Sequence, residues 1–389
     1  MQFGATITGA EVACALGNDL DTCLAAIRRG ESGLRPLAGF FGEHSGYSSL
    51  LGGWIPDRSI FAGRRYGLTS NAAVRISQAA VGRAGWTGPE LRDAAVFVGS
   101  SRGNAGELFG VGRARRPIKL FRASNLMHSE IAAAVSIELS IRGPWQVFSN
   151  GCASGLDALG YAVQAVHSGF CDRALAVAID LPLIPELLSA FQASGVLSRN
   201  NVNDPYHAET SGFLPAEAAV AVAVERGGSA LGWARVGGYS ATSDAFDSIG
   251  LPPDGAGLAD CVKLTLARSS SGRVRAICPH ATGTQNHARA ELAALNKVFG
   301  GREEIDGVLL KPYTGHTLGA SGLLDVALLA AMLRDGLLLP NRTGLSGGLP
   351  WLRLATGPQA CGPDEEVLKL SVGMGGHNAA IILRGPAGR

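Results

Sequence analysis

The chain has 389 residues and a net charge of +2, with 46% hydrophobic and 17% charged residues. Its length allows one large domain or two of ordinary size. A charged fraction well below the usual value of about 25% indicates a chain that buries much of its surface, in a core or against another subunit. A nearly neutral chain has no overall field that attracts nucleic acid or membranes, so we expect neither as a partner.

The first residues, MQFGATITGAEVACALGND, lack the basic segment and the long apolar core of a signal peptide. No apolar run reaches the roughly 18 residues that a membrane span needs. The seven cysteines are scattered without a C-x-x-C pair, which suits a reducing compartment better than a disulfide framework. We therefore expect a cytoplasmic protein.

Short apolar runs alternate with Ala/Leu-rich helical stretches along the chain. The runs are apolar throughout, which is typical of strands covered on both faces. This alternation predicts an α/β protein with a central sheet between helical layers, and its last two strands form a hairpin. The predicted strands cover residues 94–101, 174–180, 218–225, 275–283, 307–315, 366–376 and 378–384. The predicted helices cover residues 70–84, 129–140, 153–168, 286–299 and 319–334.

One cysteine, Cys152, lies between a predicted strand and a predicted helix, in GPWQVFSNGCASGLDALGYAV. Asn150 and Gly151 allow a sharp turn after the strand, so Cys152 falls at the helix N-terminus. Unpaired N–H groups and the helix dipole stabilise a thiolate there, which predicts a lowered thiol pKa and a nucleophile. The alternative is a small buried hydrophobe, which is our interpretation of the other six cysteines.

Two histidines occupy turns of the same kind. His280 in CPHATGTQNHARAE and His316 in LLKPYTGHTLGASG each follow an apolar strand and precede a helix. Turns that carry Cys152, His280 and His316 could meet at one end of a sheet, where active sites of α/β proteins gather. Lys311 lies five residues before His316, at the end of its predicted strand.

A metal site is another interpretation of the first histidine. His287 and Glu291 are spaced i, i+4 on one predicted helix, and His280 lies seven residues before His287. Zinc sites normally have three or four ligands at tighter spacing, and a fourth ligand is not evident, so we expect no metal. The glycine-rich segments VGSSRGNAG and GHTLGASG do not match the phosphate-binding pattern G-x-x-x-x-G-K-[ST].

Four motifs, in the same order, resemble those of the β-ketoacyl synthases, which are condensing enzymes of the thiolase fold. The match is closest to the ketosynthase subunits of type II polyketide systems. The segment around Cys152 resembles their nucleophile segment, and PHATGT followed by AE resembles their first histidine motif. LKPYTGHTLGASG resembles their second histidine motif, and SVGMGGHNAAIILR resembles their closing strand pair. The resemblance covers nearly the whole chain.

This resemblance implies a thiolase fold, with duplicated βαβαβ halves in a layered αβαβα arrangement. Residues 1–225 would form the half that carries the nucleophilic cysteine, and residues 226–389 the half that carries the two histidines. A homodimer, or a heterodimer with a ketosynthase-like chain-length subunit, is also implied. Substrates would arrive on the phosphopantetheine of an acyl carrier protein, with no other cofactor.

The activity that the resemblance implies is a decarboxylative condensation. Cys152 would accept an acyl chain from a carrier-protein thioester, because a thioester exchange between two sulfurs is nearly isoenergetic. His280 and His316 would stabilise the enolate formed when malonyl-carrier protein loses CO₂, and that enolate would attack the acyl-cysteine. Lys311 and Glu217 would orient the histidines and fix their protonation.

The substrate site implied by the resemblance contains Met374, Gly375, Thr282 and Thr284. The backbone N–H groups of Met374 and the nucleophilic cysteine would form an oxyanion hole. Met374 stands where the family has a Phe that gates the acyl pocket, and its flexible side chain predicts a softer gate. Ala281 replaces a glycine, and the family's Gly-Glu-Gly appears as PAEAA. These departures predict a specialised acyl chain, such as a polyene, over a plain saturated one.

Basic residues provide a candidate landing site for the acidic carrier protein. The segment 112–122, GRARRPIKLFR, is rich in arginine and lysine, and a smaller arginine pair occurs at 64–65. A run of charged residues is usually only a solvated surface, and a surface without a docking role is the competing interpretation of these segments. The predicted docking residues are Arg64, Arg65, Arg115, Arg116 and Lys119.

Two other functions are compatible with the same fold. A chain-length-type partner subunit typically lacks the nucleophilic cysteine, and a non-condensing acyltransferase would load or release chains only. Because this chain keeps Cys152, His280 and His316, the sequence favours the condensing enzyme over both.

Overall fold

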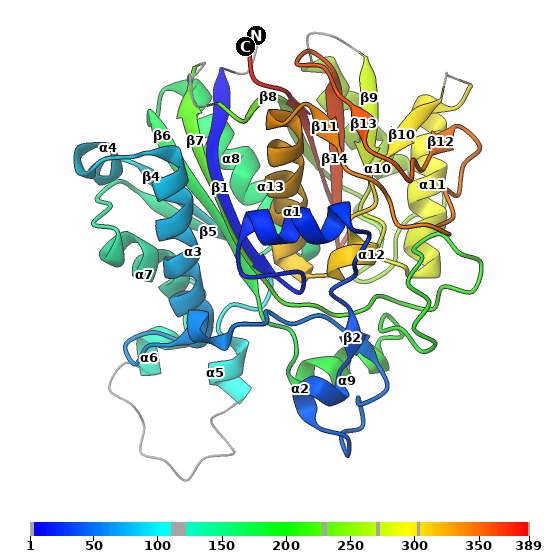
Figure 1. Cartoon of the computed structure of the whole chain (residues 1–389), viewed down its shortest axis with the longest axis horizontal. Coiled ribbons are helices and arrows are strands. Elements are labelled where there is room, and N and C mark those ends of the chain that lie inside the picture. The colour runs from blue at the N-terminus through cyan, green and yellow to red at the C-terminus, as the bar shows by residue number, and fades with distance from the viewer. Residues whose placement is uncertain (1–3, 110–121, 228–231, 270–272, 302–303, 388–389) are drawn as a thin grey trace.

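The computed structural model describes residues 4–109, 122–227, 232–269, 273–301 and 304–387. In these residues an eleven-stranded sheet runs through the protein in the order β12-β10-β9-β14-β15-β8-β1-β7-β6-β4-β5 (Figure 1). The first half of the chain supplies β1 (Ala5–Cys14), β4 (Ala95–Gly99), β5 (Trp145–Phe148), β6 (Arg173–Asp180) and β7 (Ala218–Arg226). The second half supplies β8 (Ala234–Ser243), β9 (Val274–Cys278), β10 (Ile305–Gly307), β12 (Leu352–Arg353), β14 (Glu366–Gly373) and β15 (His377–Arg384).

The two halves of the sheet repeat one topology. The first half has the order β5-β4-β6-β7-β1 and the second has β10-β9-β14-β15-β8, so corresponding strands occupy corresponding places. The pairing directions also match: β4 is parallel to β5 and β6, as β9 is to β10 and β14, and β7 and β15 are antiparallel to both neighbours. Strands β1 and β8 join the halves at the centre. We propose that the boundary between the halves lies at residues 225 and 226.

Helices lie on both outer faces and between the halves. α8 (Ser154–Ser168) and α13 (Ser321–Arg334) pack against each other and against strands of both halves, and α13 is buried along almost its whole length. α3 (Leu68–Ala84) and α7 (Glu130–Glu138) cover the first half. α10 (Ala256–Ala267) covers the second half, with α11 (Gln285–Phe299) beside it. The layers therefore follow the expected αβαβα order.

The remaining described elements are short or peripheral. They are α1 (Leu20–Arg28), β2 (Arg35–Pro36), α2 (Ala38–Phe41), β3 (Leu51–Gly52), η1 (Arg58–Phe61), α4 (Gly88–Arg92), α5 (Ala105–Phe109), α6 (Arg122–Asn125), η3 (Gly151–Ala153), α9 (Pro185–Ala193), α12 (Lys311–Thr314), η4 (Leu318–Ala320), β11 (Leu337–Leu338) and β13 (Gln359–Ala360). None of the helices described here is long and apolar enough to cross a membrane.

A close backbone contact brings the starts of α8 and α13 together. A Cβ atom added to Gly155 would lie only 2.7 Å from the carbonyl oxygen of Gly319, so no larger residue fits there without movement. The turn before α8 carries Cys152, and the turn before α13 follows His316. Close approach of the two helices therefore holds the predicted nucleophile near one predicted histidine.

Candidate active site

Cys152 lies in the 3₁₀ turn η3 between β5 and α8. Gly151 has φ +58, a left-handed conformation that glycine adopts without strain, and this turns the chain sharply after β5. The end of β14 lies against this turn: a Cβ on Gly151 would be 3.4 Å from the backbone nitrogen of Met374, and a Cβ on Gly373 would be 3.5 Å from that of Cys152. The two N–H groups expected to form an oxyanion hole are thus neighbours.

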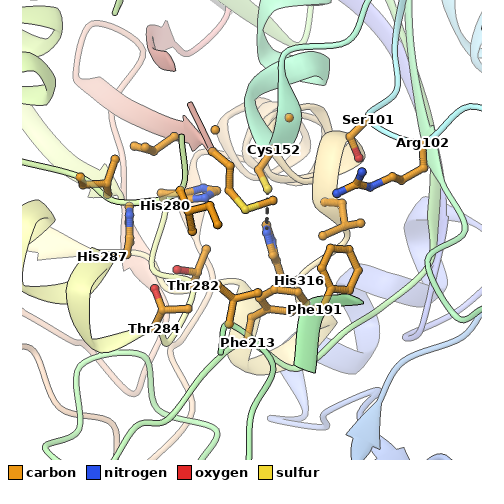
Figure 2. A pocket seen from close by; sticks show the side chains of 18 residues that line it. Ser101, Arg102, Cys152, Phe191, Phe213, His280, Thr282, Thr284, His287 and His316 are labelled. Atoms are coloured by element: carbon orange, nitrogen blue, oxygen red, sulfur yellow. Dashed lines mark hydrogen bonds between the residues drawn. The ribbon is translucent and has the colours of Figure 1, made fainter. Parts of the chain in front are cut away.

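Two histidines lie beside the thiol, as Figure 2 shows. His316 Nε2 is 3.1 Å from Cys152 Sγ, and its ring packs edge-on against Phe213. The rings of His280 and His316 have centroids 5.4 Å apart. One ligand atom from each of Cys152, His280 and His316 lies within 4.8 Å of the others. The structure therefore brings together the three turns that were expected to meet.

Burial keeps these three groups uncharged. It raises the pKa of Cys152 to about 12, with a further rise from the Asp180 carboxylate and opposing effects of Lys311 and Arg102. Burial, followed by the Lys311 charge, lowers the pKa of both His280 and His316 well below the usual value. The prediction of a lowered thiol pKa is wrong, because burial disfavours the charged thiolate. These shifts favour a neutral thiol and neutral imidazoles in the resting site.

This protonation state predicts how Cys152 reacts with pH. The rate of alkylation by iodoacetamide should rise about tenfold per pH unit from pH 7 to pH 10 without a plateau, because only the thiolate reacts and its fraction grows until the pH reaches the pKa. Labelling at Cys152 is followed by peptide mass spectrometry, with Cys152→Ala as the blank. A plateau below pH 8 would instead show a preformed thiolate–imidazolium pair.

Lys311 is the first residue of α12 and not the last residue of a strand, so that part of the prediction is wrong. Its ammonium is buried 3.5 Å from Asp325 Oδ2. The same carboxylate oxygen accepts a 2.5 Å hydrogen bond from Lys369 Nζ. Burial lowers the pKa of Lys311, whereas Asp325 opposes that shift. Lys311 is thus a buried group whose charge acts on both active-site histidines.

Glu217 contacts neither histidine through its side chain. The carboxylate accepts a hydrogen bond from the backbone N–H of Ile55 at 3.2 Å and pairs with Arg58. Its chain neighbour Ala216 does reach the site, since its N–H donates to the carbonyl oxygen of His316 at 3.0 Å. The Glu217 side chain itself points toward Ile55 and Arg58 and not toward the histidines. The prediction that Glu217 orients the histidines is therefore wrong.

Glu291 holds the first histidine motif instead. Its carboxylate accepts hydrogen bonds from the backbone N–H groups of His280 and Ala281 at 2.6 and 2.9 Å, and from the Tyr206 hydroxyl at 2.8 Å. His287 Nε2 lies 3.2 Å away. Burial alone would raise the pKa of Glu291, but His287 and the hydrogen-bond donors lower it to about 2. The sequence signal was the Glu that closes the first histidine motif, for which we predicted no role in positioning His280.

A mostly apolar pocket opens over the thiol. The predicted substrate-site residues Thr282, Thr284 and Met374 all line it, and the Met374 side chain is 39% exposed. Gly375, with φ +90, is not one of the lining residues but forms the turn that follows Met374. The apolar wall consists of Phe191, Val196, Phe213, Ile249, Leu251, Leu318 and Val372.

The predicted docking residues are only partly within the described structure. Arg64 is exposed, and Arg65 forms a 3.2 Å ion pair with Glu138. Arg115, Arg116 and Lys119 lie outside the described residues. Docking of a carrier protein at these positions therefore stays a prediction.

A cluster around Asp157, which sequence reasoning missed, ties the cysteine turn to the closing hairpin. Asp157 Oδ2 accepts a 2.6 Å hydrogen bond from Asn150 Nδ2, and Oδ1 accepts one of 2.8 Å from the Tyr239 hydroxyl. His377 Nε2 lies 2.7 Å from Oδ2, and this carboxylate raises the pKa of His377. No sequence pattern connects these residues, because they meet only through the packing of β8 and β15 on α8.

Comparison with known proteins identifies the class. Residues 5–230 match the family model of the β-ketoacyl synthase N-terminal domain, and residues 233–344 match that of the C-terminal domain. The chain therefore belongs to the β-ketoacyl synthase family.

Individual relatives fall into two groups. The ketoacyl synthase alpha subunit of the tetracenomycin polyketide synthase from Streptomyces glaucescens is 31% identical over 66% of this chain and 64% of its own length. The 3-oxoacyl-[acyl-carrier-protein] synthase 1 of Haemophilus influenzae is 27% identical over 97% of this chain and 98% of its own. The match spans 58–66% of the length of the polyketide relatives.

Solved structures share the fold. A type II polyketide ketosynthase, solved with its acyl-carrier protein and bound to a hexaketide, superposes with a TM-score of 0.84 at 23% identity, covering 99% of this chain and all of that one. The ishigamide ketosynthase/chain length factor gives a TM-score of 0.86 at 24% identity, with both chains fully covered. The expected thiolase fold is confirmed.

Proposed function

We propose that this protein is a β-ketoacyl-[acyl-carrier-protein] synthase. It would join an acyl chain on Cys152 to malonyl-carrier protein by decarboxylative Claisen condensation, in polyketide or specialised fatty-acid or polyene synthesis. The observation that carries this proposal is the 3.1 Å contact between Cys152 Sγ and His316 Nε2, in a pocket that also contains His280. Membership of the family supports it.

The first half-reaction moves the acyl group to Cys152. The neutral thiol transfers its proton to His316 Nε2 as the sulfur attacks the thioester carbonyl of the acyl-carrier protein. The backbone N–H groups of Cys152 and Met374 stabilise the resulting oxyanion. The C–S bond to phosphopantetheine then breaks, and the leaving thiolate recovers the proton. A neutral His316 is the state that this step requires, because only an unprotonated ring nitrogen can accept the proton.

The second half-reaction forms the new carbon–carbon bond. The ring N–H of His280, and that of His316 once its ring proton has moved from Nδ1 to Nε2, donate hydrogen bonds to the thioester oxygen of malonyl-carrier protein. At the same time CO₂ leaves, and the electron pair of the broken C–C bond forms the enolate. The enolate carbon attacks the acyl-cysteine, and the Cys152 thiolate leaves and takes up a proton from solvent, which balances the loss of CO₂ from the malonyl carboxylate. Burial, and after it the charge of Lys311, disfavours a second proton on either imidazole, so both rings enter this step as neutral donors. The product is a β-ketoacyl chain two carbons longer.

An acyl carrier protein and a second subunit of the same fold are the partners that we propose. Solved relatives include a ketosynthase with its acyl-carrier protein and one paired with a chain length factor. In this chain β5 is an edge strand of the sheet, and Trp145 on it is 44% exposed. Such an edge has free backbone groups for pairing with another strand, so we place the dimer contact there. The seven free thiols suit the cytoplasm.

Three further expectations stay predictions. Met374 would gate the pocket that it lines, and Arg64 and Arg65 would help to dock the carrier. The absence of a metal needs its own check, because a thiol and two imidazoles this close could bind zinc; metal analysis of the purified protein provides it.

The test of the proposed function is acylation of Cys152. Intact-mass spectrometry after incubation with acyl-carrier proteins should show one added acyl group on the wild-type chain and none on Cys152→Ala, because the nucleophile is gone. Adding malonyl-carrier protein should then release β-ketoacyl-carrier product. Cys171→Ala, which removes a thiol that does not line the pocket, is the matched control and should behave as wild type.

Each failure in this test points to a different function. Acyl transfer that persists in Cys152→Ala would remove Cys152 from the mechanism. Acylation without malonyl decarboxylation would favour the non-condensing acyltransferase. A wild-type chain that takes no acyl group from any carrier would favour the chain-length-type partner subunit.

A further inference from the structure

One cationic side chain lines the otherwise largely apolar pocket at Cys152. Arg102 follows β4, and Figure 2 shows its guanidinium extending toward the thiol. Its carbon Cζ lies 5.3 Å from the ring centroid of Phe191. Nε of Arg102 is buried and has no hydrogen-bond partner within the described part of the chain. Arg102 is partly buried, and polar atoms removed from water normally have a hydrogen-bond partner, so its unpartnered Nε requires an explanation.

The adjacent carboxylate, Asp180, is already occupied. It accepts hydrogen bonds from the hydroxyl of Ser100, from the N–H and hydroxyl of Ser101, and from the backbone N–H of Gly319, at 2.7–3.0 Å. Its fifth donor is the backbone N–H of Arg102 at 2.9 Å. Asp180 thus fixes the backbone of Arg102, whereas the guanidinium forms no ion pair with an acidic group of the described residues.

We propose that Arg102 binds an oxygen of the acyl group, so that this pocket prefers acyl chains bearing a keto or carboxylate oxygen over pure hydrocarbon chains. This inference rests on the proposed function, because it requires an acyl chain above Cys152. A planar guanidinium is suited to oxygen acceptors of this kind, while Val196, Phe213 and Leu318 accommodate the methylene segments. A fully hydrocarbon polyene, the example drawn from Met374, would leave the guanidinium without a partner.

The experiment measures binding and not turnover. The protein carries Cys152→Ala, so that no chemistry occurs, and calorimetry gives the Kd of three pantetheine thioesters with matched chains: octanoyl, 3-oxooctanoyl and 7-carboxyheptanoyl. Arg102→Met in this background should raise the Kd of one or both oxygenated ligands by about tenfold or more, as expected for a lost charge-assisted hydrogen bond. Octanoyl binding should be unchanged or tighter, and Arg102→Lys should restore part of the loss.

The control and the outcomes separate this inference from the function on which it rests. Arg35 also has a buried, unpartnered Nε and lies 3.8 Å above the Trp54 ring, yet it does not line this pocket; Arg35→Met should change no Kd. If Arg102→Met weakens binding of the 3-oxooctanoyl thioester alone, the keto oxygen is the group that Arg102 binds. If it weakens binding of the 7-carboxyheptanoyl thioester alone, the carboxylate is that group. Equal affinities with and without Arg102, or no binding of any ligand, would overturn the inference. Condensation by the enzyme with Cys152 intact is measured separately and can succeed or fail independently.

Discussion

His280→Ala should slow malonyl decarboxylation at least about a hundredfold while leaving acylation of Cys152 nearly unchanged. The size follows from the loss of one donor to a developing oxyanion. The selectivity of the effect follows from position, because it is His316 whose Nε2 lies within hydrogen-bond distance of the Cys152 sulfur. Release of ¹⁴CO₂ from labelled malonyl-carrier protein measures decarboxylation, and intact-mass spectrometry measures acylation of Cys152.

His316→Ala provides the contrast within the same site. Since His316 Nε2 lies 3.1 Å from Sγ, this variant should slow both acylation and decarboxylation. His207 is exposed and outside the pocket, so His207→Ala should leave both rates unchanged. If both active-site variants lost the two steps equally, or if neither step changed, the separate roles of the two rings would be refuted.

Local sequence predicted the buried strands well but missed those with unusual composition. The continuous apolar run 174–180 corresponds to β6, and the predicted hairpin corresponds to β14 and β15. β8 was missed because its Gly237 and Gly238 reduce strand propensity, although a Cβ on Gly237 would lie 2.8 Å from the Ile382 side chain. The strand predicted at 307–315 ends at Gly307, since the apolar residues after it are buried without forming a ladder.

At the site, motif resemblance located the reacting residues but not their environment. Cys152, His280 and His316 were found because each follows a strand or turn in a recognisable pattern. The thiol pKa was wrong because burial is a tertiary property that a helix start does not reveal. Glu217 was misassigned because its backbone neighbour contacts the site while its own side chain does not. Arg102 was overlooked because its segment, VGSSRGNAG, was compared only with the phosphate-binding pattern, which it does not match.

Ala281 shows how a motif departure is accommodated. Its φ of +47 is the left-handed conformation that the family's glycine would adopt freely, and that costs a non-glycine residue of order 1 kcal/mol. The hydrogen bond from its N–H to Glu291 at 2.9 Å, close to the bond from His280, holds this conformation. Thus the sequence change alters local strain, while the backbone that positions His280 is kept.

Asp325→Asn should be strongly destabilising, by about 3–5 kcal/mol, because it removes the carboxylate from a buried ion cluster. Asp325 is 1% exposed on α13 and pairs with both Lys369, at 2.5 Å, and Lys311, at 3.5 Å. The asparagine keeps the shape of the side chain but leaves two ammonium groups buried without a counter-charge. Denaturant unfolding followed by circular dichroism measures the change in free energy of unfolding.

Asp335→Asn is the matched control at the other end of α13. Asp335 pairs with Arg28 and Arg334 at a more exposed position, and its loss should cost no more than about 1 kcal/mol. A similarly small cost for Asp325→Asn would mean that one buried lysine releases its proton when the carboxylate is removed. Lys311 would then be the first candidate, because burial already lowers its pKa. Without that positive charge, the pKa of His280 and His316 should move back toward the ordinary value, and the pH profile of decarboxylation in Asp325→Asn should shift upward with it.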